Sequence, residues 1–489
     1  MDAVCGVQPG PSVSGMSAPP DTPLPVLLVT SNGVGMGHLT RQLTVALSAP
    51  DRLDPVLMSL SGALPTVATA VAEGRLPELR GVRTEYCPSR KSGWLPSGGL
   101  GRRLREVHPA YGWEPYFADR LHALVAETGA RLVLFDGVVP YAGLREARRR
   151  LEGTPFVWMR RGMWRPGAGE QWLEHAGLFD LVVEPGDFAA EGDRGATVGR
   201  DDAHRVAPIS IADAIELQDR ATARRALGLD PDRPALLLTP GTGALEDVAS
   251  PAQVALDVVR RVAPDWQVAV TSPALARHGI TGDDLVLLTD TYPLARSLAA
   301  FDAAVSAAGY NSVHELLGAR IPTVLVPGQS LGTDDQPGRA ATLAAAGACL
   351  SATPEDPEAV RAAVTAVLET ATAERLRTVC AGLPATTGGR ETADLLVDLA
   401  AGAAPPAPLA ATGWGPPVWR RALPDPRTPV DVVSDDGAGT TGRRGRRPLR
   451  LTQELPAHRL GDAPLEHLVQ GSSPEYRRAR AEIARWIYR

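Results

Sequence analysis

Short, continuous apolar runs recur along the chain up to residue 326, and stretches with helical composition separate them. The first run is PVLLVT at 25–30, and others follow at 131–135, 155–158, 181–183, 235–239, 267–270, 286–288 and 322–326. The intervening segments at 115–128, 142–151, 251–262 and 339–346 are rich in alanine and arginine. Apolar runs of this kind are typical of parallel strands buried on both faces. The alternation therefore predicts a doubly wound α/β architecture.

The pattern restarts near residue 234, where an apolar run again leads into a glycine-rich turn, and this restart predicts two Rossmann-like lobes. We expect a first lobe at 24–208 and a second at 209–400. Residues 1–23 are expected to be disordered. The composition after residue 400 predicts a Pro/Gly/Arg-rich, mostly disordered linker at 401–448 and a helical tail at 449–489. Residues 80–120 are rich in glycine, proline and aromatic residues, and we expect an irregular insertion there.

Charge and hydropathy exclude several classes of protein. The 489 residues carry a formal net charge of -6, which argues against a globally basic nucleic-acid binder. No apolar run approaches the ~20 residues of a membrane helix, and the N-terminal segment lacks the pattern of a signal peptide. The four cysteines have no CxxC spacing, which fits a reducing compartment. We therefore expect a cytoplasmic protein, with room for peripheral contact at the inner face of a membrane.

The first motif with chemical character follows the first apolar run and opens a helix. It contains Gly33, Gly35, Gly37, His38 and Arg41. Glycines allow a ligand to approach the backbone, and a helix N-terminus offers free N–H groups. The spacing is imperfect for a dinucleotide-binding fingerprint, because His38 follows the third glycine. His38 could also be a histidine bonded locally at the start of the helix, but its place at the mouth of the sheet favours a role in a cleft.

A second motif passes from a strand through a glycine turn into a helix, as FDAAVSAAGYNSVHELLG at 301–318. Ser312 and Glu315 have the S-x-x-E spacing of a capping box, so Glu315 could simply bond back to the start of the helix. The alternative is that its carboxylate binds a ligand. The segment IPTVLVP follows, and then Asp335 and Gln336.

These residues resemble the donor half of the GT-B glycosyltransferases, specifically family 28. The resemblance rests on Ser306, Gly309, Ser312 and Glu315, followed by two prolines and Asp335-Gln336. The glycine loop that ends in His38 is similar to the family's acceptor-lobe motif, and the turn at 240–244 is similar to the glycine turn that opens its donor lobe. The resemblance covers residues 25 to about 400.

The resemblance implies a role for each matching position. Glu315 would accept hydrogen bonds from both ribose hydroxyls of a nucleotide-sugar, and Asp335 and Gln336 would hold sugar hydroxyls. Backbone groups near the two glycine turns would bind the diphosphate, and the segment that contains Thr291 would contact the base. The expected donor-binding residues are Gly241, Thr242, Gly243, Ala244, Thr291, Tyr292, Gly309, Asn311, Ser312, Glu315, Asp335 and Gln336.

In the first lobe, the resemblance makes His38 the candidate general base or a phosphate or acceptor contact. Asp136, which follows a predicted strand, would orient it, although a turn-capping role for this aspartate is an open alternative. The expected acceptor-lobe residues are Gly33, Gly35, Gly37, Arg41, Arg160 and Arg161. No metal or other cofactor is expected, because the only DxD sequence, at 230–232, reads as a turn before a strand.

The sequence thus predicts a glycosyltransferase that uses a UDP-sugar or similar nucleotide-sugar, with metal-independent inversion at the sugar carbon. The acceptor would be a small molecule, a lipid-linked compound or a glycan. Two alternatives remain at this point: a nucleotide-sugar 2-epimerase of the same fold, for which no convincing acid/base set is found, and a non-catalytic nucleotide-sugar sensor.

Overall fold

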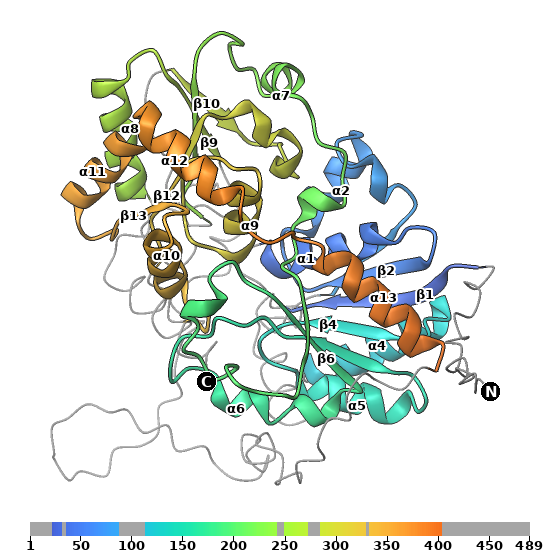
Figure 1. The fold of residues 1–489 in the computed structure, drawn as a ribbon. Coiled ribbons are helices and arrows are strands. Elements are labelled where there is room, and N and C mark those ends of the chain that lie inside the picture. The colour runs from blue at the N-terminus through green and yellow to red at the C-terminus, as the bar shows by residue number, and fades with distance from the viewer. Residues whose placement is uncertain are drawn as a thin grey trace, which may run out of the picture.

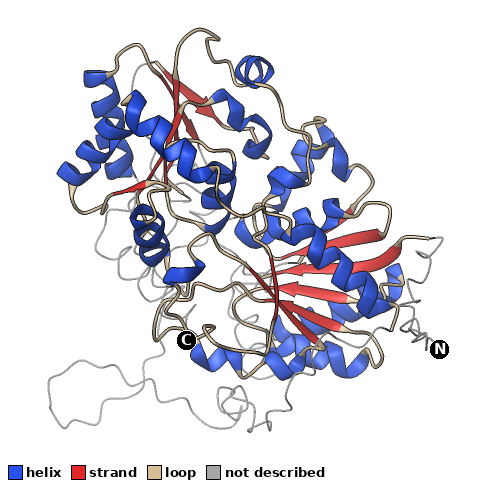
Figure 2. Cartoon of the chain, in the orientation of Figure 1, coloured by secondary structure: helices blue, strands red, loops and turns tan. Residues whose placement is uncertain are grey.

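The computed structural model contains two lobes, each built around a parallel β-sheet with helices on its faces (Figures 1 and 2). It describes residues 22–31, 36–87, 113–241, 249–271, 284–328 and 332–402. The strand order is β3-β2-β1-β4-β5-β6-β7 in the first sheet and β10-β9-β8-β11-β12-β13 in the second. The predicted fold class of two Rossmann-like lobes is confirmed. Apart from 22–23 and 401–402, the predicted N-terminal segment, linker and helical tail lie outside the described residues.

The first lobe alternates strands and helices. Its strands are β1 (Leu24–Thr30), β2 (Leu53–Ser59), β3 (Arg83–Tyr86), β4 (Val133–Asp136), β5 (Phe156–Met159), β6 (Leu181–Pro185) and β7 (His204–Val206). Its helices are α1 (Gly37–Ser48), α2 (Leu64–Ala72), α4 (Trp113–Thr128), α5 (Ala142–Arg150) and the short α6 (Glu170–Leu173). Single 3-10 turns are η1 (Pro77–Leu79), η3 (Ala176–Leu178), η4 (Ala190–Gly192) and η5 (Ile211–Asp213).

The second lobe repeats this plan. Its strands are β8 (Ala235–Thr239), β9 (Gln267–Thr271), β10 (Leu285–Leu288), β11 (Ala303–Ser306), β12 (Thr323–Leu325) and β13 (Leu350–Ser351). Its helices are α7 (Arg220–Ala226), α8 (Ala249–Val262), the 3-10 helix η6 (Leu294–Ala300), α9 (Tyr310–Gly318), α10 (Gln336–Ala345), α11 (Pro357–Val367), α12 (Thr370–Cys380) and α13 (Gly388–Ala400).

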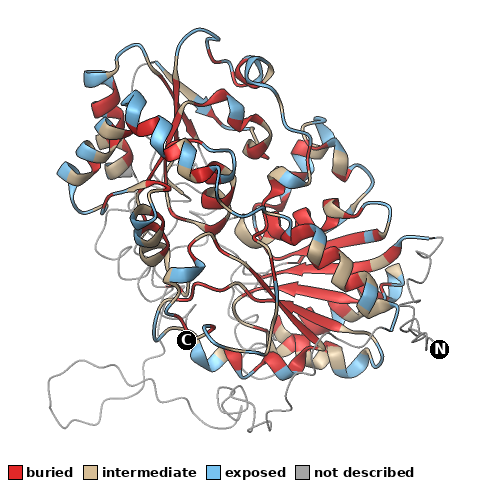
Figure 3. Cartoon of the chain, viewed as in Figure 1, coloured by how far each residue is buried: buried red, intermediate tan, exposed pale blue. Residues whose placement is uncertain are grey.

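Burial on both faces of the sheet explains why the first strand is a continuous apolar run. Val26 and Leu28 of β1 pack into one hydrophobic cluster, with α1, α2 and α13, whereas Leu27 and Val29 pack into another, with α4 and α5. All four side chains are fully buried, and Figure 3 shows the same burial along the central strands of both sheets. Both layers of helices are therefore required to cover the sheet.

The last described helix, α13, returns to the first lobe and packs on α1 (Figure 1). Close approach is possible because Gly389 has no side chain: a Cβ at this position would lie 2.8 Å from Thr44 Cγ2 and 2.7 Å from Ser48 Oγ. Gly388 is equally constrained, since its Cβ would clash with the carbonyl of Ala207. The C-terminal part of the described chain thus ties the second lobe back to the first.

The segment predicted to be irregular, 80–120, is only partly so. Edge strand β3 pairs in parallel with β2, and the first residues of α4 also fall within the segment, while 88–112 lie outside the described residues. The strand was missed because its side chains are mostly exposed, so it has no apolar run. In the described part of the chain, no helix has the length and apolar character needed to cross a bilayer.

Candidate active site

The candidate site lies where the carboxyl ends of the two sheets meet. In the first lobe, β1 and β4 end side by side, with Thr30 opposite Asp136. In the second lobe, the neighbouring strands β8 and β11 end with Thr239 opposite Ser306. Helix α1 follows β1 and helix α9 follows β11, so both helices begin at this edge. Ligands of open α/β sheets bind at such edges.

His38 and Asp136, which the sequence predicts as partners, lie in contact in the structure. His38 is the second residue of α1, and its Nδ1 lies 2.7 Å from Oδ1 of Asp136, the last residue of β4. Asp136 is buried, whereas His38 is partly exposed to the cleft. Arg41, one helical turn after His38, joins this pair: its Nε donates to Asp136 Oδ2 at 3.0 Å and its Nη2 to Oδ1 at 2.8 Å. Asp136 therefore serves as more than a turn cap.

The electrostatics of the cluster favour a neutral imidazole. Burial lowers the pKa of His38, Asp136 raises it, and the positive charges of Arg41 and Arg161 lower it further, so that the pKa lies below its ordinary value. Burial alone would raise the pKa of Asp136, but Arg41 and His38 outweigh it and hold that pKa below its usual range. The result is an ionised carboxylate beside an uncharged imidazole, which can act as a base.

Glu315 carries an uncompensated carboxyl group in the second lobe. Within the described residues, no hydrogen bond or ion pair engages its side chain, and burial raises its pKa to about 8. The capping-box alternative is wrong, because α9 begins at Tyr310 with Gly309 as its N-cap, and Glu315 lies in the second turn. A half-buried carboxyl group that has no partner in the described part of the chain costs folding free energy unless a ligand engages it.

Contacts across the lobe interface surround Glu315 and His38. Asn311, in the first turn of α9, donates to the carbonyl of Gly37 at 3.4 Å. The hydroxyls of Tyr292 and Thr40 lie 3.2 Å apart, and the carboxyl of Glu315 is close enough to contribute to the raised pKa of Tyr292, which burial mainly causes. The first turns of α1 and α9 are therefore held together at the site.

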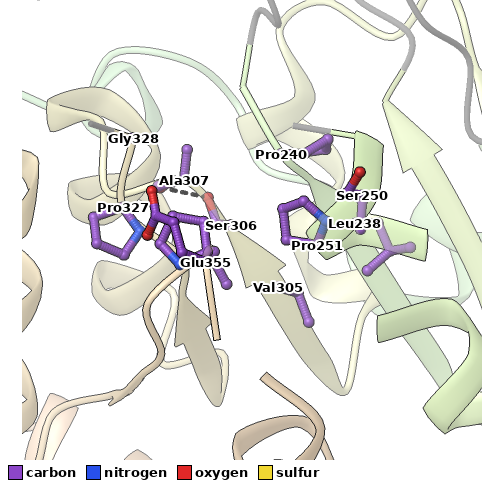
Figure 4. Close-up of a pocket in the computed structure, with 13 residues that line it drawn as sticks. Leu238, Pro240, Ser250, Pro251, Val305, Ser306, Ala307, Pro327, Gly328 and Glu355 are labelled. Carbon is purple, nitrogen blue, oxygen red and sulfur yellow. Dashed lines mark hydrogen bonds between the residues drawn. The ribbon is translucent and has the colours of Figure 1, made fainter. Parts of the chain in front are cut away.

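The glycine turn that opens the second lobe lies beside a cavity of about 360 Å³. Gly241 has φ +96°, a conformation that favours glycine, and a Cβ there would lie 3.3 Å from the Cβ of Ala307. Figure 4 shows the cavity between Pro327 and Glu355 on one side and Pro240 and Pro251 on the other. Glu315 is not among the lining residues. The other predicted members of the glycine turns, Gly33, Gly35, Thr242, Gly243 and Ala244, lie outside the described residues.

The remaining predicted donor residues differ in how far they are free to bind a ligand. Asp335 is the N-cap of α10 and accepts from the amide of Gly338 at 3.0 Å, while Gln336 Oε1 accepts from the amide of Gly328 at 3.0 Å. Both already have partners within the protein, although Gln336 keeps its NH₂ group for another. Thr291 and Ser312 make no side-chain hydrogen bond within the described residues. Their predicted roles remain predictions.

Arg160 does not fit the role of acceptor contact that the sequence suggested. Its side chain is fully buried and its Nη2 donates to Glu184 at 3.1 Å and to Asp202 at 2.8 Å. These two carboxylates compensate the positive charge of the Arg160 guanidinium, as a buried cation requires. Arg160 therefore stabilises the interior of the first lobe. Arg161, the next residue, points instead to the lobe interface.

The sequence did not predict a chain of alternating charges that crosses this interface. Arg161 of the first lobe lies 3.1 Å from Asp334 of the second, and Arg339 of α10 lies 2.9 Å from the same carboxylate. Arg339 Nε then donates at 2.8 Å to Asp187, which follows β6 in the first lobe. The acidic pair at 334–335 followed by an arginine was visible in the sequence, but nothing there identified partners more than 140 residues away.

Metal ligands do not gather in the described part of the chain. No group of three or more His, Cys, Asp or Glu side chains there could hold an ion. Asp230 and Asp232 of the DxD sequence lie in the turn before β8, where the amide of Asp232 donates to the carboxylate of Asp230 at 2.9 Å. Cys87, Cys349 and Cys380 are buried cysteines in the thiol form.

Two lobes, each with a parallel sheet covered by helices, form the architecture of the GT-B fold. No family model matches the chain. It is 29% identical over 333 residues to a UDP-N-acetylglucosamine--N-acetylmuramyl-(pentapeptide) pyrophosphoryl-undecaprenol N-acetylglucosamine transferase of Clavibacter michiganensis subsp. michiganensis, which covers 66% of this chain and 86% of the relative. The identically named protein of Clavibacter sepedonicus matches to the same extent, over 334 residues.

Among solved structures, the glycosyltransferase SnogD from Streptomyces nogalater aligns with a TM-score of 0.49 at 19% identity, over 78% of this chain and 100% of that one. The two Clavibacter relatives confirm the resemblance to family 28. The chain is a glycosyltransferase with the GT-B fold.

Proposed function

We propose that the protein transfers a sugar from a UDP-sugar, or a similar nucleotide-sugar, by a metal-independent displacement that inverts the sugar carbon. The observation that carries the proposal is Glu315, a carboxyl group in the interlobe site that no group of the described chain engages. Two adjacent hydroxyls, as on a ribose, can donate to the two oxygens of one carboxylate. Such hydrogen bonds favour the ionised form and would offset the cost of its burial.

His38 supplies the second part of the proposed chemistry. An acceptor hydroxyl must lose its proton as it attacks the sugar carbon, and a neutral imidazole with one free nitrogen can take that proton. The oxygens of the departing diphosphate would be met by backbone N–H groups at the start of α9, where Gly309 precedes the helix and no side chain caps it. Gly241, with its positive φ, would allow close approach from the other turn.

The acceptor is proposed only by class. The two Clavibacter relatives are named for an acceptor linked to pyrophosphoryl-undecaprenol, and for UDP-N-acetylglucosamine as donor. We propose UDP-N-acetylglucosamine as the first donor to test, and a lipid-linked acceptor ahead of a small molecule or a glycan. A lipid-linked acceptor would bring the protein to the inner face of a membrane as a peripheral enzyme.

The test is nucleotide binding followed by transfer. Thermal unfolding of the wild type is measured with UDP, UDP-N-acetylglucosamine, UDP-glucose and TDP-glucose, with a chelator present. We expect a rise in the midpoint with a uridine nucleotide that disappears in Glu315→Ala. Glu374→Ala is the matched control, because Glu374 is exposed on α12 of the same lobe and its removal should leave the shift intact.

Release of UDP in the presence of membrane extract then distinguishes a transferase from a sensor. Nucleotide binding with UDP release that depends on both His38 and added extract supports the transferase. Binding without any release would favour the sensor, and the absence of a thermal shift with every nucleotide would overturn the donor site itself.

A further inference from the structure

We propose that Arg41 is a positioning residue that sets the protonation state of His38: by occupying the carboxylate of Asp136, it keeps the imidazole neutral with Nε2 free to act. The charge setting is a property of the protein without substrate. Its catalytic consequence rests on the function proposed above.

The guanidinium of Arg41 binds Asp136 in a two-pronged arrangement. Nε donates to Oδ2 at 3.0 Å and Nη2 to Oδ1 at 2.8 Å, so that both carboxylate oxygens have a cationic partner. Arg41 and Asp136 are only 2% and 1% exposed, where solvent screens their charges weakly. Arg41 therefore neutralises a negative charge that would otherwise act on His38 alone.

The contacts of Nδ1 also bear on the tautomer of His38. Nδ1 lies 2.7 Å from Asp136 Oδ1 and 2.9 Å from Arg41 Nη2. A protonated Nδ1 donates to Oδ1, whereas an unprotonated Nδ1 would accept from Arg41 Nη2 and place its lone pair against the carboxylate oxygen. The contact with the carboxylate is the shorter of the two, which favours the protonated Nδ1. We therefore assign the proton to Nδ1, which donates to Oδ1. Nε2 is then left unprotonated, as a base requires.

The short distance between Arg41 and the ring makes the arginine more than a structural partner of Asp136. Its Nη2 places positive charge 2.9 Å from Nδ1, and this charge opposes the addition of a second proton at Nε2. The guanidinium of Arg41 lies over the ring of Tyr310, 5.4 Å from the ring centroid. The negative charge of Asp334 helps to raise the pKa of Arg41 and so favours its charged form.

The other charged group that acts on His38 is Arg161, which follows β5. Burial is the largest influence on the pKa of His38 and lowers it, Asp136 raises it, and Arg41 and Arg161 lower it. Removal of Arg41 would both delete a neighbouring positive charge and release Asp136 from its partner. Both changes stabilise the imidazolium, so they act in the same direction.

The experiment is an NMR titration of His38 in the unliganded protein with ¹³Cε1-labelled histidine. The chain has 9 histidines, and the spectrum of His38→Gln identifies the signal. Arg41→Met should raise the titration midpoint by about one pH unit or more, a tenfold change in the ratio of protonated to neutral imidazole. Asp136→Asn should lower it. The double variant should lie between the two single variants, because both charges are then absent.

Two further variants separate charge from structure. Arg41→Lys retains the positive charge and should titrate within about half a unit of the wild type. Arg224→Met is the matched control: Arg224 is also 2% exposed and paired with a carboxylate, that of Asp302, but in the second lobe. It should leave the titration of His38 unchanged.

A wild-type midpoint in Arg41→Met would overturn the proposal. If that variant does not fold, Arg41→Gln takes its place, because it removes the same positive charge and keeps a polar side chain; a wild-type midpoint in Arg41→Gln would equally refute the proposal. No substrate enters this test, so its failure leaves the proposed transferase function standing. Failure of nucleotide binding, in turn, leaves the charge setting intact.

Discussion

The carboxyl group of Glu315 makes nucleotide-sugar binding depend on pH. Its pKa is raised to about 8 by burial, so near pH 7 only about a tenth of the unliganded molecules carry the ionised form. If ribose hydroxyls donate to the carboxylate, binding requires that form, and the apparent dissociation constant is the intrinsic one divided by the ionised fraction. The fraction rises from about 3% at pH 6.5 to about 76% at pH 8.5, so affinity should increase about 25-fold over this range.

Isothermal titration calorimetry with a UDP-sugar measures this dependence directly. A UDP-sugar is preferable to UDP, because its diphosphate is esterified at both ends and does not titrate in this range. Titrations in buffers of different ionisation enthalpy should also show that about 0.9 proton is released on binding at pH 7, provided that the bound carboxyl has a pKa near 5 or lower.

Glu315→Gln provides the control, because an amide of the same shape cannot ionise. It should bind more weakly than the wild type at pH 8.5, and its dissociation constant should not vary with pH. A wild-type dissociation constant that changes less than threefold between pH 6.5 and 8.5, or a pH dependence that persists in Glu315→Gln, would refute the assignment of Glu315 as the ribose-binding carboxylate.

Three further predictions concern individual residues and the metal. Arg160→Met should lower the free energy of unfolding by about 1.5–3 kcal/mol, because Glu184 and Asp202 lose their buried cation and keep only Arg205 and Arg200, and chemical denaturation measures the loss. Gly241→Ala should cost about 1–2 kcal/mol in the same assay, because alanine is strained at φ +96°; equal stability would show that the turn adapts. Chelation should leave the rate of UDP release unchanged, and a rate that falls with EDTA and returns with Mg²⁺ or Mn²⁺ would contradict the metal-independent mechanism.

Much of the fold could be predicted from the sequence, because a continuous apolar run indicates a strand that is buried on both faces of its sheet. The run at 25–30 and its counterparts mark strands that two layers of helices cover, and most of these strands are present. Edge strand β3 escaped prediction because Arg83, Thr84 and Tyr86 are exposed and show no apolar run. Strand β2 was also missed, since Pro55 interrupts its apolar character, although Pro55 is buried within the strand.

The site was predicted unevenly for a similar reason. The pairing of His38 with Asp136 came from the resemblance to known glycosyltransferases, and the structure shows its physical basis: β1 and β4 end side by side at one edge of a parallel sheet. The ion pairs of Arg160 could not be foreseen, because arginine is usually exposed and its partners at 184 and 202 lie on later segments. Spacing alone left the role of Glu315 open, because Ser312 and Glu315 match a capping box. The helix begins two residues before Ser312, so this pattern does not lie at the helix start.

The two halves of the proposed chemistry belong to different lobes, and this has a consequence for how binding and catalysis are linked. Glu315 is carried by α9, whereas His38 is carried by α1, and the contacts of Asn311 with Gly37 and of Tyr292 with Thr40 join the two helices. A nucleotide that contacts the second lobe alone can stabilise the closed contact between α1 and α9 under one condition: its affinity must be higher when the two lobes are in contact. Tyr292 is near Glu315 and is hydrogen-bonded to Thr40 of α1. A ligand bound at Glu315 would therefore lie next to a side chain that the first lobe holds in position. Donor binding should therefore favour the lobe arrangement in which His38 faces the site, and variants that break the interface should weaken donor affinity and transfer together.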